Sequence, residues 1–250
     1  MAILQTLKEA LLFYVRYFWL VILAAALSVI PSVYDRELID SQVYSNGYLM
    51  LLVLLVRIVI SLSVFALQDA VILGLLSRPP GRMDTRTIIL KTIENYFWTL
   101  FRLECLIGML AMAVSMLGLQ IVERLFGHIK FFFFILPFIN LIFMKYALAA
   151  PLVVVESLGA WIALWQSWKM TKGHFGFVAG CYIIIAGANW LVWHVGIKPE
   201  LLVDVCNYAF DPFWIIVSWC MYKRIKALEN ELETTSVPFT QSPPKSTSAP

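Results

Sequence analysis

The chain has 250 residues, of which 61% are hydrophobic and only 14% are charged, and its formal net charge is +3. Soluble domains are ~45–50% apolar and ~25% charged, so this composition excludes an ordinary soluble protein and indicates that much of the apolar surface faces lipid. The modest positive charge gives no reason to expect a nucleic-acid partner.

The first predicted membrane span runs from about Leu11 to Ile30 and ends before Pro31. We expect it to stay as an uncleaved anchor, because Arg16 interrupts the apolar run and no convincing small-residue cleavage site precedes Pro31. The second apolar segment, Tyr48 to Leu76, is longer than a ~30 Å hydrocarbon core requires. This helix is therefore expected to tilt or to protrude from the membrane.

An amphipathic helix is predicted to follow, with Asp84 or Thr85 as its N-cap. The third span covers about Phe101 to Val122, and the fourth covers Ile129 to Ala150. Pro137 lies inside the fourth span, where neighbouring helices can satisfy the freed carbonyl.

Pro151 begins a third unit, in which Ser157 to Lys172 is predicted to form a helix lying in the membrane plane. Its apolar residues recur at helical spacing, and tryptophan on such a face suits the headgroup boundary. These residues are Leu158, Trp161, Leu164, Trp165 and Trp168. Spans five and six follow at about Phe175–Val195 and Val205–Tyr222, and residues 226–250 are predicted to be a disordered cytoplasmic tail.

The joins between amphipathic helix and apolar span recur at a nearly fixed period. They centre on Phe18, Phe97 and Phe175, which are 79 and then 78 residues apart. Such a period predicts internal repeats. We therefore expect an all-α integral membrane domain over residues 1–225, with six transmembrane helices in three repeats of one interfacial amphipathic helix plus two spans (1–76, 77–150 and 151–222).

Basic residues predict the orientation of these spans. With a cytoplasmic N-terminus, ten basic residues fall on inside segments and four on outside loops. Both termini are then cytoplasmic, and all three interfacial helices meet the anionic headgroups of the cytoplasmic leaflet.

The stretch from Ala150 to Phe175 resembles a signature of bacterial six-span proteins related to the membrane domain of glycerophosphodiester phosphodiesterases. The residues that carry it are Pro151, Glu156, Gly159, Ser167, Thr171, Gly173 and Phe175. Ser157 departs from the family, which usually has glycine there. The resemblance implies a multi-pass protein of the bacterial inner membrane without hydrolase activity, since the soluble catalytic barrel of these enzymes is absent.

Several charged residues fall in or near the predicted spans. Intramembrane charges usually face the helix bundle or a wet cavity, although long side chains also reach the interface. Snorkelling side chains and a buried polar cluster both remain open for Asp69, Arg102, Glu104 and Lys145. Arg57 either lies at the outer interface or contacts an anion or lipid phosphate.

Glu156 completes this candidate polar cluster. It is read either as an acidic residue favoured near a helix N-terminus or as an ion-pair latch, with Lys145 and Arg102 as its expected partners. Ser167 and Thr171 lie four residues apart on one helix face, where their hydroxyls can cap or back-bond to carbonyls.

Motifs for catalysis, metals and cofactors are missing from the sequence. The three histidines have no zinc-ligand spacing, there is no nucleophile elbow or phosphate-binding loop, and the four scattered cysteines form no C-x-x-C pair. We therefore expect a non-enzymatic membrane protein without a cofactor: a scaffold, an envelope-maintenance factor or a subunit that binds a membrane-protein partner. The alternative is a transporter or lipid-handling protein that uses the polar cluster between the repeats.

Overall fold

The computed structural model describes residues 2–19, 47–77, 85–126, 144–194 and 200–236. Helices form almost all of these ranges, with no strand among them, which confirms the predicted all-α class. The helices are α1 (Ala2–Arg16), α3 (Gly47–Leu76), α4 (Thr85–Phe126), the short 3-10 helix η3 (Met144–Tyr146), α6 (Ala149–Val155), α7 (Ala160–Gly173), α8 (Phe175–His194) and α9 (Glu200–Ser236).

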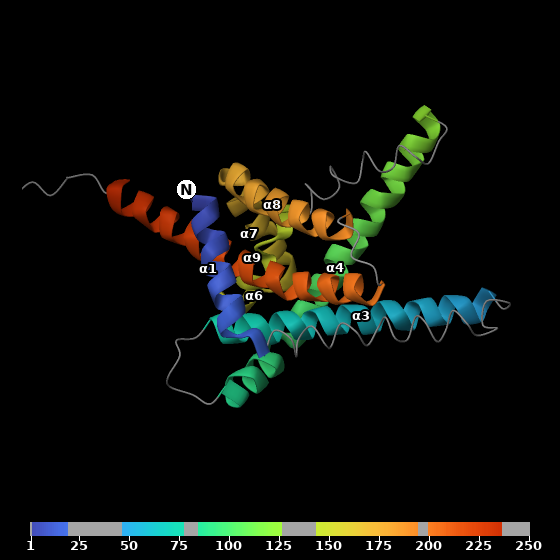
Figure 1. Cartoon of the computed structure of the whole chain (residues 1–250), viewed down its shortest axis with the longest axis horizontal. Coiled ribbons are helices and arrows are strands. Elements are labelled where there is room, and N and C mark those ends of the chain that lie inside the picture. The colour runs from blue at the N-terminus through green and yellow to red at the C-terminus, as the bar shows by residue number, and fades with distance from the viewer. Residues whose placement is uncertain (1, 20–46, 78–84, 127–143, 195–199, 237–250) are drawn as a thin grey trace, which may run out of the picture.

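Helices α3 and α4 cross and make the most extensive helix–helix contact of the described chain (Figure 1). The close approach occurs at Gly74, where an added Cβ would lie 2.6 Å from Oγ1 of Thr92 on α4. Thr92 is itself buried, and its hydroxyl donates to the carbonyl of Ile88. Glycine therefore brings the two backbones together at a point where any other side chain would push them apart.

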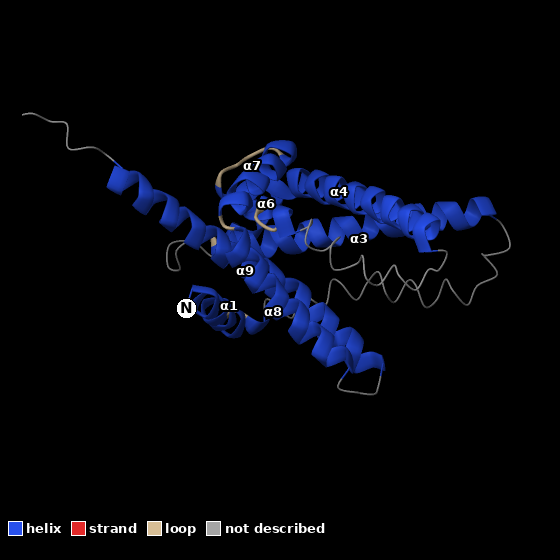
Figure 2. Cartoon of the chain, turned by 90° about the horizontal axis from the view of Figure 1, so that it is seen from above, coloured by secondary structure: helices blue, strands red, loops and turns tan. Residues whose placement is uncertain are grey.

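The short helix α6 lies at the centre of the protein, in contact with α3, α4, α7 and α9 (Figure 2). Five of its residues are buried, namely Ala149, Pro151, Leu152, Val153 and Val154. Helix α1 packs on α9 and α8 on the other side of the molecule. The N-terminal helix thus contacts the C-terminal one directly, and α6, which carries part of the family-like signature, also packs against α9.

The chain leaves α6 in a strained turn. Ser157 has φ 54°, the left-handed region that favours glycine. Its Oγ is hydrogen-bonded to the hydroxyl of Tyr96 on α4 at 3.0 Å. Gly159 then caps α7 in an extended conformation. This serine is the residue at which the sequence departs from the signature that the stretch is predicted to resemble.

Within the described ranges, two helices are long and apolar enough to cross a membrane, over Leu51–Leu76 and Thr85–Gly118. Only 11% of the most apolar window of each is buried within the protein, so neither is the core helix of a soluble fold. Neither lies at the N-terminus, where a signal sequence would. These observations favour a location in a membrane.

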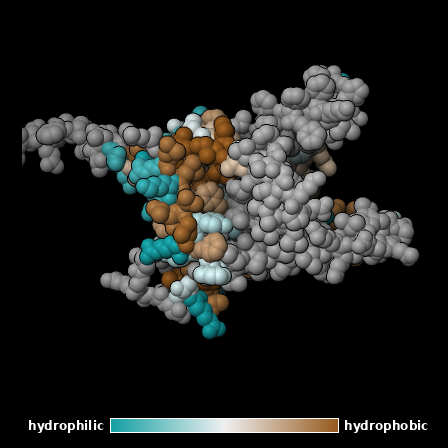
Figure 3. Space-filling model, viewed as in Figure 1, coloured by the Kyte–Doolittle hydropathy of each residue, from teal (hydrophilic) through white to brown (hydrophobic). Residues whose placement is uncertain are grey.

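The surface of the other helices is consistent with this location. Figure 3 shows hydrophobic side chains gathered over the described part of this face of the molecule, with hydrophilic side chains along one edge. On α7 the tryptophans point away from the protein, with Trp161 73% and Trp165 60% exposed. The face of α7 that packs inward carries smaller residues, Ala163 and Ser167 among them.

The second unit differs from the predicted arrangement. The amphipathic segment before Phe97 and the third predicted span form one continuous helix, α4, of 42 residues, or about 63 Å at 1.5 Å per residue. No proline or glycine interrupts residues 85–107, so the helix has no reason to break at the join. At the third join, by contrast, His174 separates α7 from α8.

Two further boundaries differ from the expected ones. The end of the fourth predicted span forms η3 and α6, so Pro151 lies inside a helix rather than before an interfacial one. Helix α9 continues to Ser236 through residues that favour helix, so the first part of the predicted tail is helical. Residues 20–46, 127–143 and 237–250 lie outside the described ranges, and the six spans and the threefold repeat remain predictions.

Candidate functional site

A cavity of about 390 Å³ lies between α3, α4, α6, α8 and α9, next to η3. Its volume falls within the ~300–1,000 Å³ of small-molecule sites. Polar side chains line it from three helices: Gln68 and Asp69 of α3, Glu104 of α4 and Ser218 of α9. Aromatic side chains line it as well, and these are Phe65, Tyr146, Tyr182 and Trp214.

Asp69 and Glu104 face each other across the contact between α3 and α4. Their carboxyl groups interact electrostatically and lie within hydrogen-bonding reach of each other. Asp69 is 7% exposed, and both side chains line the cavity. A carboxylate can only accept hydrogen bonds, so a bond between two carboxyl groups requires a proton on one of them. Two carboxyl groups this close disfavour ionisation of both, so we interpret Asp69 and Glu104 as an acid pair that shares one proton.

Ser218 supplies a further polar group from α9. The residue is 4% exposed, and its Oγ has no hydrogen-bond partner in the described part of the chain. A buried hydroxyl without a partner costs free energy, on the order of 1–3 kcal/mol. Such a group in the wall of a cavity is typical of a site that a bound molecule completes.

The aromatic wall is held by contacts between its own members. Tyr182 of α8 and Trp214 of α9 meet edge to face, with ring centroids 5.2 Å apart and an interplanar angle of 89°. Pro151 of α6 closes the same cavity from the centre of the protein. One residue of the family-like signature is therefore part of the site.

Other signature residues hold the chain around η3. The Oγ of Ser167 donates to the carbonyl of Lys145 at 2.7 Å and accepts the N–H of Leu148 at 3.2 Å. Thr171 donates to the carbonyl of Ser167, four residues earlier, at 2.7 Å, which is the predicted back-bonding. Both hydroxyl residues are fully buried. They fix the turn that presents Tyr146 to the cavity.

Lys145 contacts aromatic rings instead of an acidic group. Its Nζ lies 4.9 Å from the ring centroid of Trp168 and 4.9 Å from that of Phe175. Phe175 is the first residue of α8, and Gly173 is the last of α7. The lysine thus joins the turn at η3 to the bend between these two helices through cation–π contacts.

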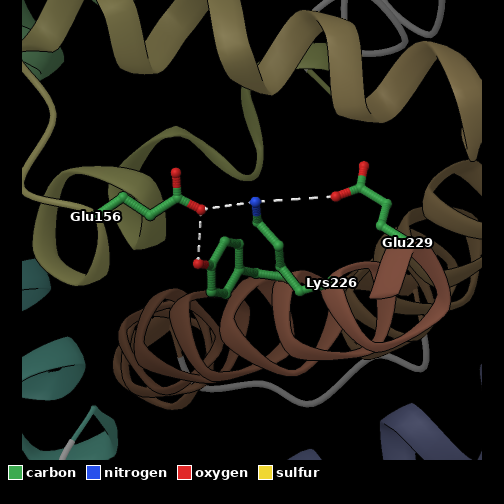
Figure 4. Close-up of polar contacts among 4 residues, drawn as sticks. Glu156, Lys226 and Glu229 are labelled. Carbon is green, nitrogen blue, oxygen red and sulfur yellow. Dashed lines mark hydrogen bonds and ion pairs between the residues drawn. The ribbon is translucent and has the colours of Figure 1, made fainter. Parts of the chain in front are cut away.

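Glu156 follows α6 and reaches α9 (Figure 4). Its Oε1 lies 2.9 Å from Nζ of Lys226 and accepts the hydroxyl of Tyr222 at 2.9 Å. The expected partners, Lys145 and Arg102, are the wrong ones, because the carboxylate is bound by Lys226 and Tyr222 of α9 instead. Glu229 lies 3.8 Å from the same lysine nitrogen.

The structure therefore divides the six residues of the predicted cluster. It brings Asp69 and Glu104 together at the cavity, whereas Lys145 and Glu156 belong to separate structural contacts. Arg57 and Arg102 are exposed. Arg57 lies twelve residues before Asp69 on α3, or about 18 Å along the helix axis.

Sequence reasoning missed most of the cavity wall, including Tyr146, Tyr182, Trp214 and Ser218. Each lies in an apolar segment whose pattern does not distinguish it from its neighbours. Ser218 carried the one available signal, a hydroxyl within a predicted span. Within the described ranges, no group of three or more His, Cys, Asp or Glu side chains could hold a metal ion.

Comparison with known proteins adds no relative. No protein-family model matches the chain. Neither a curated protein nor a solved structure is similar to it. The resemblance in the stretch from Ala150 to Phe175 therefore stays a prediction, and the function has to be argued from the cavity and the helices around it.

Proposed function

We propose that this chain is a non-enzymatic, multi-pass protein of the bacterial inner membrane that binds a small molecule in the cavity between α3, α4 and α9, as a transporter or lipid-handling protein does. One observation carries the proposal. A transporter should have a cavity that reaches a charged residue of the apolar segments, and the cavity here reaches both Asp69 and Glu104. A protein with only a scaffolding role needs no such space in its core.

Binding rather than catalysis is proposed because the site offers an acid pair and aromatic walls but no activated nucleophile. Among the described lining residues, Ser218 is the only serine, threonine or cysteine, and none is a histidine. A serine nucleophile needs an adjacent general base within hydrogen-bond reach. The Oγ of Ser218 has no such partner in the described part of the chain.

Two substitutions on α4 test this proposal whatever the ligand is. Ala111 lines the cavity, whereas its neighbour Met112 is 53% exposed on the outer surface. Ala111→Phe fills the cavity, and Met112→Phe is the matched control. Each protein is purified under native conditions, and the small molecules that co-purify are identified by mass spectrometry.

We expect wild type and Met112→Phe to retain a compound that Ala111→Phe loses. If all three proteins carry the same compounds in the same amounts, the cavity does not bind them and the proposal is wrong. Equal melting temperatures of the two variants show that the loss reflects filling of the cavity rather than unfolding.

The six spans and the cytoplasmic termini belong to the same proposal. Reporter fusions after Tyr44 and Lys198 should be external, and fusions after Arg82 and Lys245 should be internal. An external reporter at Lys245 would overturn the orientation.

A scaffold remains the second candidate, favoured by the exposed face of α7. Trp161 and Trp165 project from this face, and Ile162 beside them is 56% exposed. If a partner protein covers the face, brominated lipids should not quench its tryptophans in membranes. Strong quenching instead assigns the face to the headgroup boundary.

A further inference from the structure

The acid pair lies in a part of the protein where a negative charge needs a counter-charge. Asp69 and Glu104 line the cavity, and none of the described lining residues is a lysine, arginine or histidine. An unpaired carboxylate away from water is costly and is stabilised by a cation or neutralised by a proton. Lys145 of η3 precedes the lining residue Tyr146, but its ammonium group makes cation–π contacts with Trp168 and Phe175.

The cavity walls favour an organic cation over a metal ion. Hard metal cations take about six to eight oxygen ligands, or six in octahedral geometry for Mg²⁺. Here aromatic rings occupy much of the wall, from Phe65, Tyr146, Tyr182 and Trp214. Aromatic faces together with carboxylates are the usual surroundings of ammonium groups. The hydroxyl of Ser218 adds one unused hydrogen-bonding group for the polar end of a ligand.

We propose that the cavity binds a small organic cation, an amine or quaternary ammonium compound, whose positive charge pairs with Asp69 and Glu104 while its apolar part packs on the aromatic wall. This inference rests on the proposed binding function and names its ligand class. The cation replaces the shared proton of the acid pair. Charge balances when the protonated pair plus the cation gives the complex plus one released proton.

Among the described titratable groups around the cavity, only the two carboxyl groups can release the proton when the cation binds. Tyr146 from η3 and Tyr182 from α8 are the titratable cavity residues of the neighbouring elements, and Cys105 follows Glu104 on α4. The lining residues of α6 and α9 carry no titratable side chain. Tyrosine and cysteine are neutral at neutral pH, so the proton released on binding comes from the acid pair.

The test uses three probes of the same shape and different charge. These are choline, its neutral carbon analogue 3,3-dimethylbutan-1-ol, and the anion 3,3-dimethylbutanoate. Binding to the full chain in lipid nanodiscs is measured by isothermal titration calorimetry in two buffers of different ionisation enthalpy. The difference between the buffers gives the number of protons released.

We expect choline to bind at least tenfold more tightly than the neutral probe, with release of about one proton, and the anion not to bind. Asp69→Asn and Glu104→Gln, which keep size and shape, should each weaken choline binding at least tenfold. The control is Glu94→Gln, which removes an exposed carboxylate from the same helix and should leave binding unchanged.

The outcomes separate the ligand class from the binding function. If the neutral or the anionic probe binds more tightly than choline, the ligand is not a cation, but the proposed binding function still stands. The same conclusion follows if choline binds equally well to wild type, Asp69→Asn and Glu104→Gln. If no probe binds and Ala111→Phe also leaves the co-purifying compounds unchanged, both proposals fail. If no probe binds but Ala111→Phe loses a co-purifying compound, the identity of that compound decides. A compound without positive charge contradicts the proposed ligand class only, and an organic cation supports it.

Discussion

Glu156→Gln tests whether the contact between the end of α6 and α9 stabilises the fold. The carboxylate accepts a hydrogen bond from Tyr222 at 2.9 Å and pairs with Lys226 at 2.9 Å. Both partners lie on α9, so the side chain of Glu156 connects the end of the short helix α6 to the C-terminal helix α9. The substitution keeps the shape of the side chain and removes its charge.

The size of the effect follows from the exposure of the pair. The side chains of Lys226 and Glu156 are 33% and 27% exposed, so solvent partly screens their attraction. An exposed ion pair is worth about 0–1 kcal/mol. Hydrogen bonds to a charged group are worth about 1.5–3 kcal/mol, and glutamine keeps a neutral acceptor for one of them. We expect a loss of about 1–2 kcal/mol of unfolding free energy, which corresponds to a melting temperature about 2–8 °C lower.

The assay is thermal unfolding in detergent, followed by circular dichroism. Glu94→Gln is a suitable control because Glu94 is exposed on α4, whereas Glu229 is not, since its Oε2 lies 3.8 Å from the same Lys226 nitrogen. In a Lys226→Met background the cost of Glu156→Gln should shrink, because the ion pair is already lost. Equal melting temperatures for Glu156→Gln and Glu94→Gln would refute a stabilising contact.

Two further predictions concern the backbone. Ser157 has φ 54°, so Ser157→Gly relieves about 1 kcal/mol of backbone strain. The same substitution removes the hydroxyl contact to Tyr96, and the melting temperature should therefore change little. Ser157→Ala removes the contact without relieving the strain and should lower the melting temperature. A clear gain for alanine would show that the backbone is not strained. At Gly74 an added Cβ meets Thr92 at 2.6 Å, so Gly74→Ala should cost about 1–3 kcal/mol. Gly187→Ala on α8, with nothing within 4 Å, should be neutral or stabilising, and equal effects of the two substitutions would contradict tight packing at the crossing.

The local sequence pattern was sufficient to predict where several helices lie and what some side chains do. Apolar runs of membrane length predicted α3 and the apolar part of α4, since a span is a property of consecutive residues. The back-bond of Thr171 to the carbonyl of Ser167 was also within reach, because it joins residues four apart on one helix. Helix boundaries were harder: an interfacial helix before Phe97 and a separate span after it were expected, but α4 continues through this join.

Partners distant in the sequence were beyond such reasoning. Glu156 was expected to pair with Lys145 or Arg102, but its partners on α9 are 66 and 70 residues away. The same holds for the strained Ser157, whose hydroxyl contact is with Tyr96, 61 residues earlier.

Composition and periodicity by themselves determined that this chain is helical, and they predicted that lipid rather than water faces much of it. Both follow from how each segment interacts with its solvent, and that interaction is local. Only the tertiary structure decided that Asp69 and Glu104 meet, that Arg57 stays apart from them, and that Ser218 joins them from α9. The physical reason is that a cavity belongs to no single helix. It depends on the angle and register at which α3 and α4 cross, and these are set by close packing at Gly74 and Thr92.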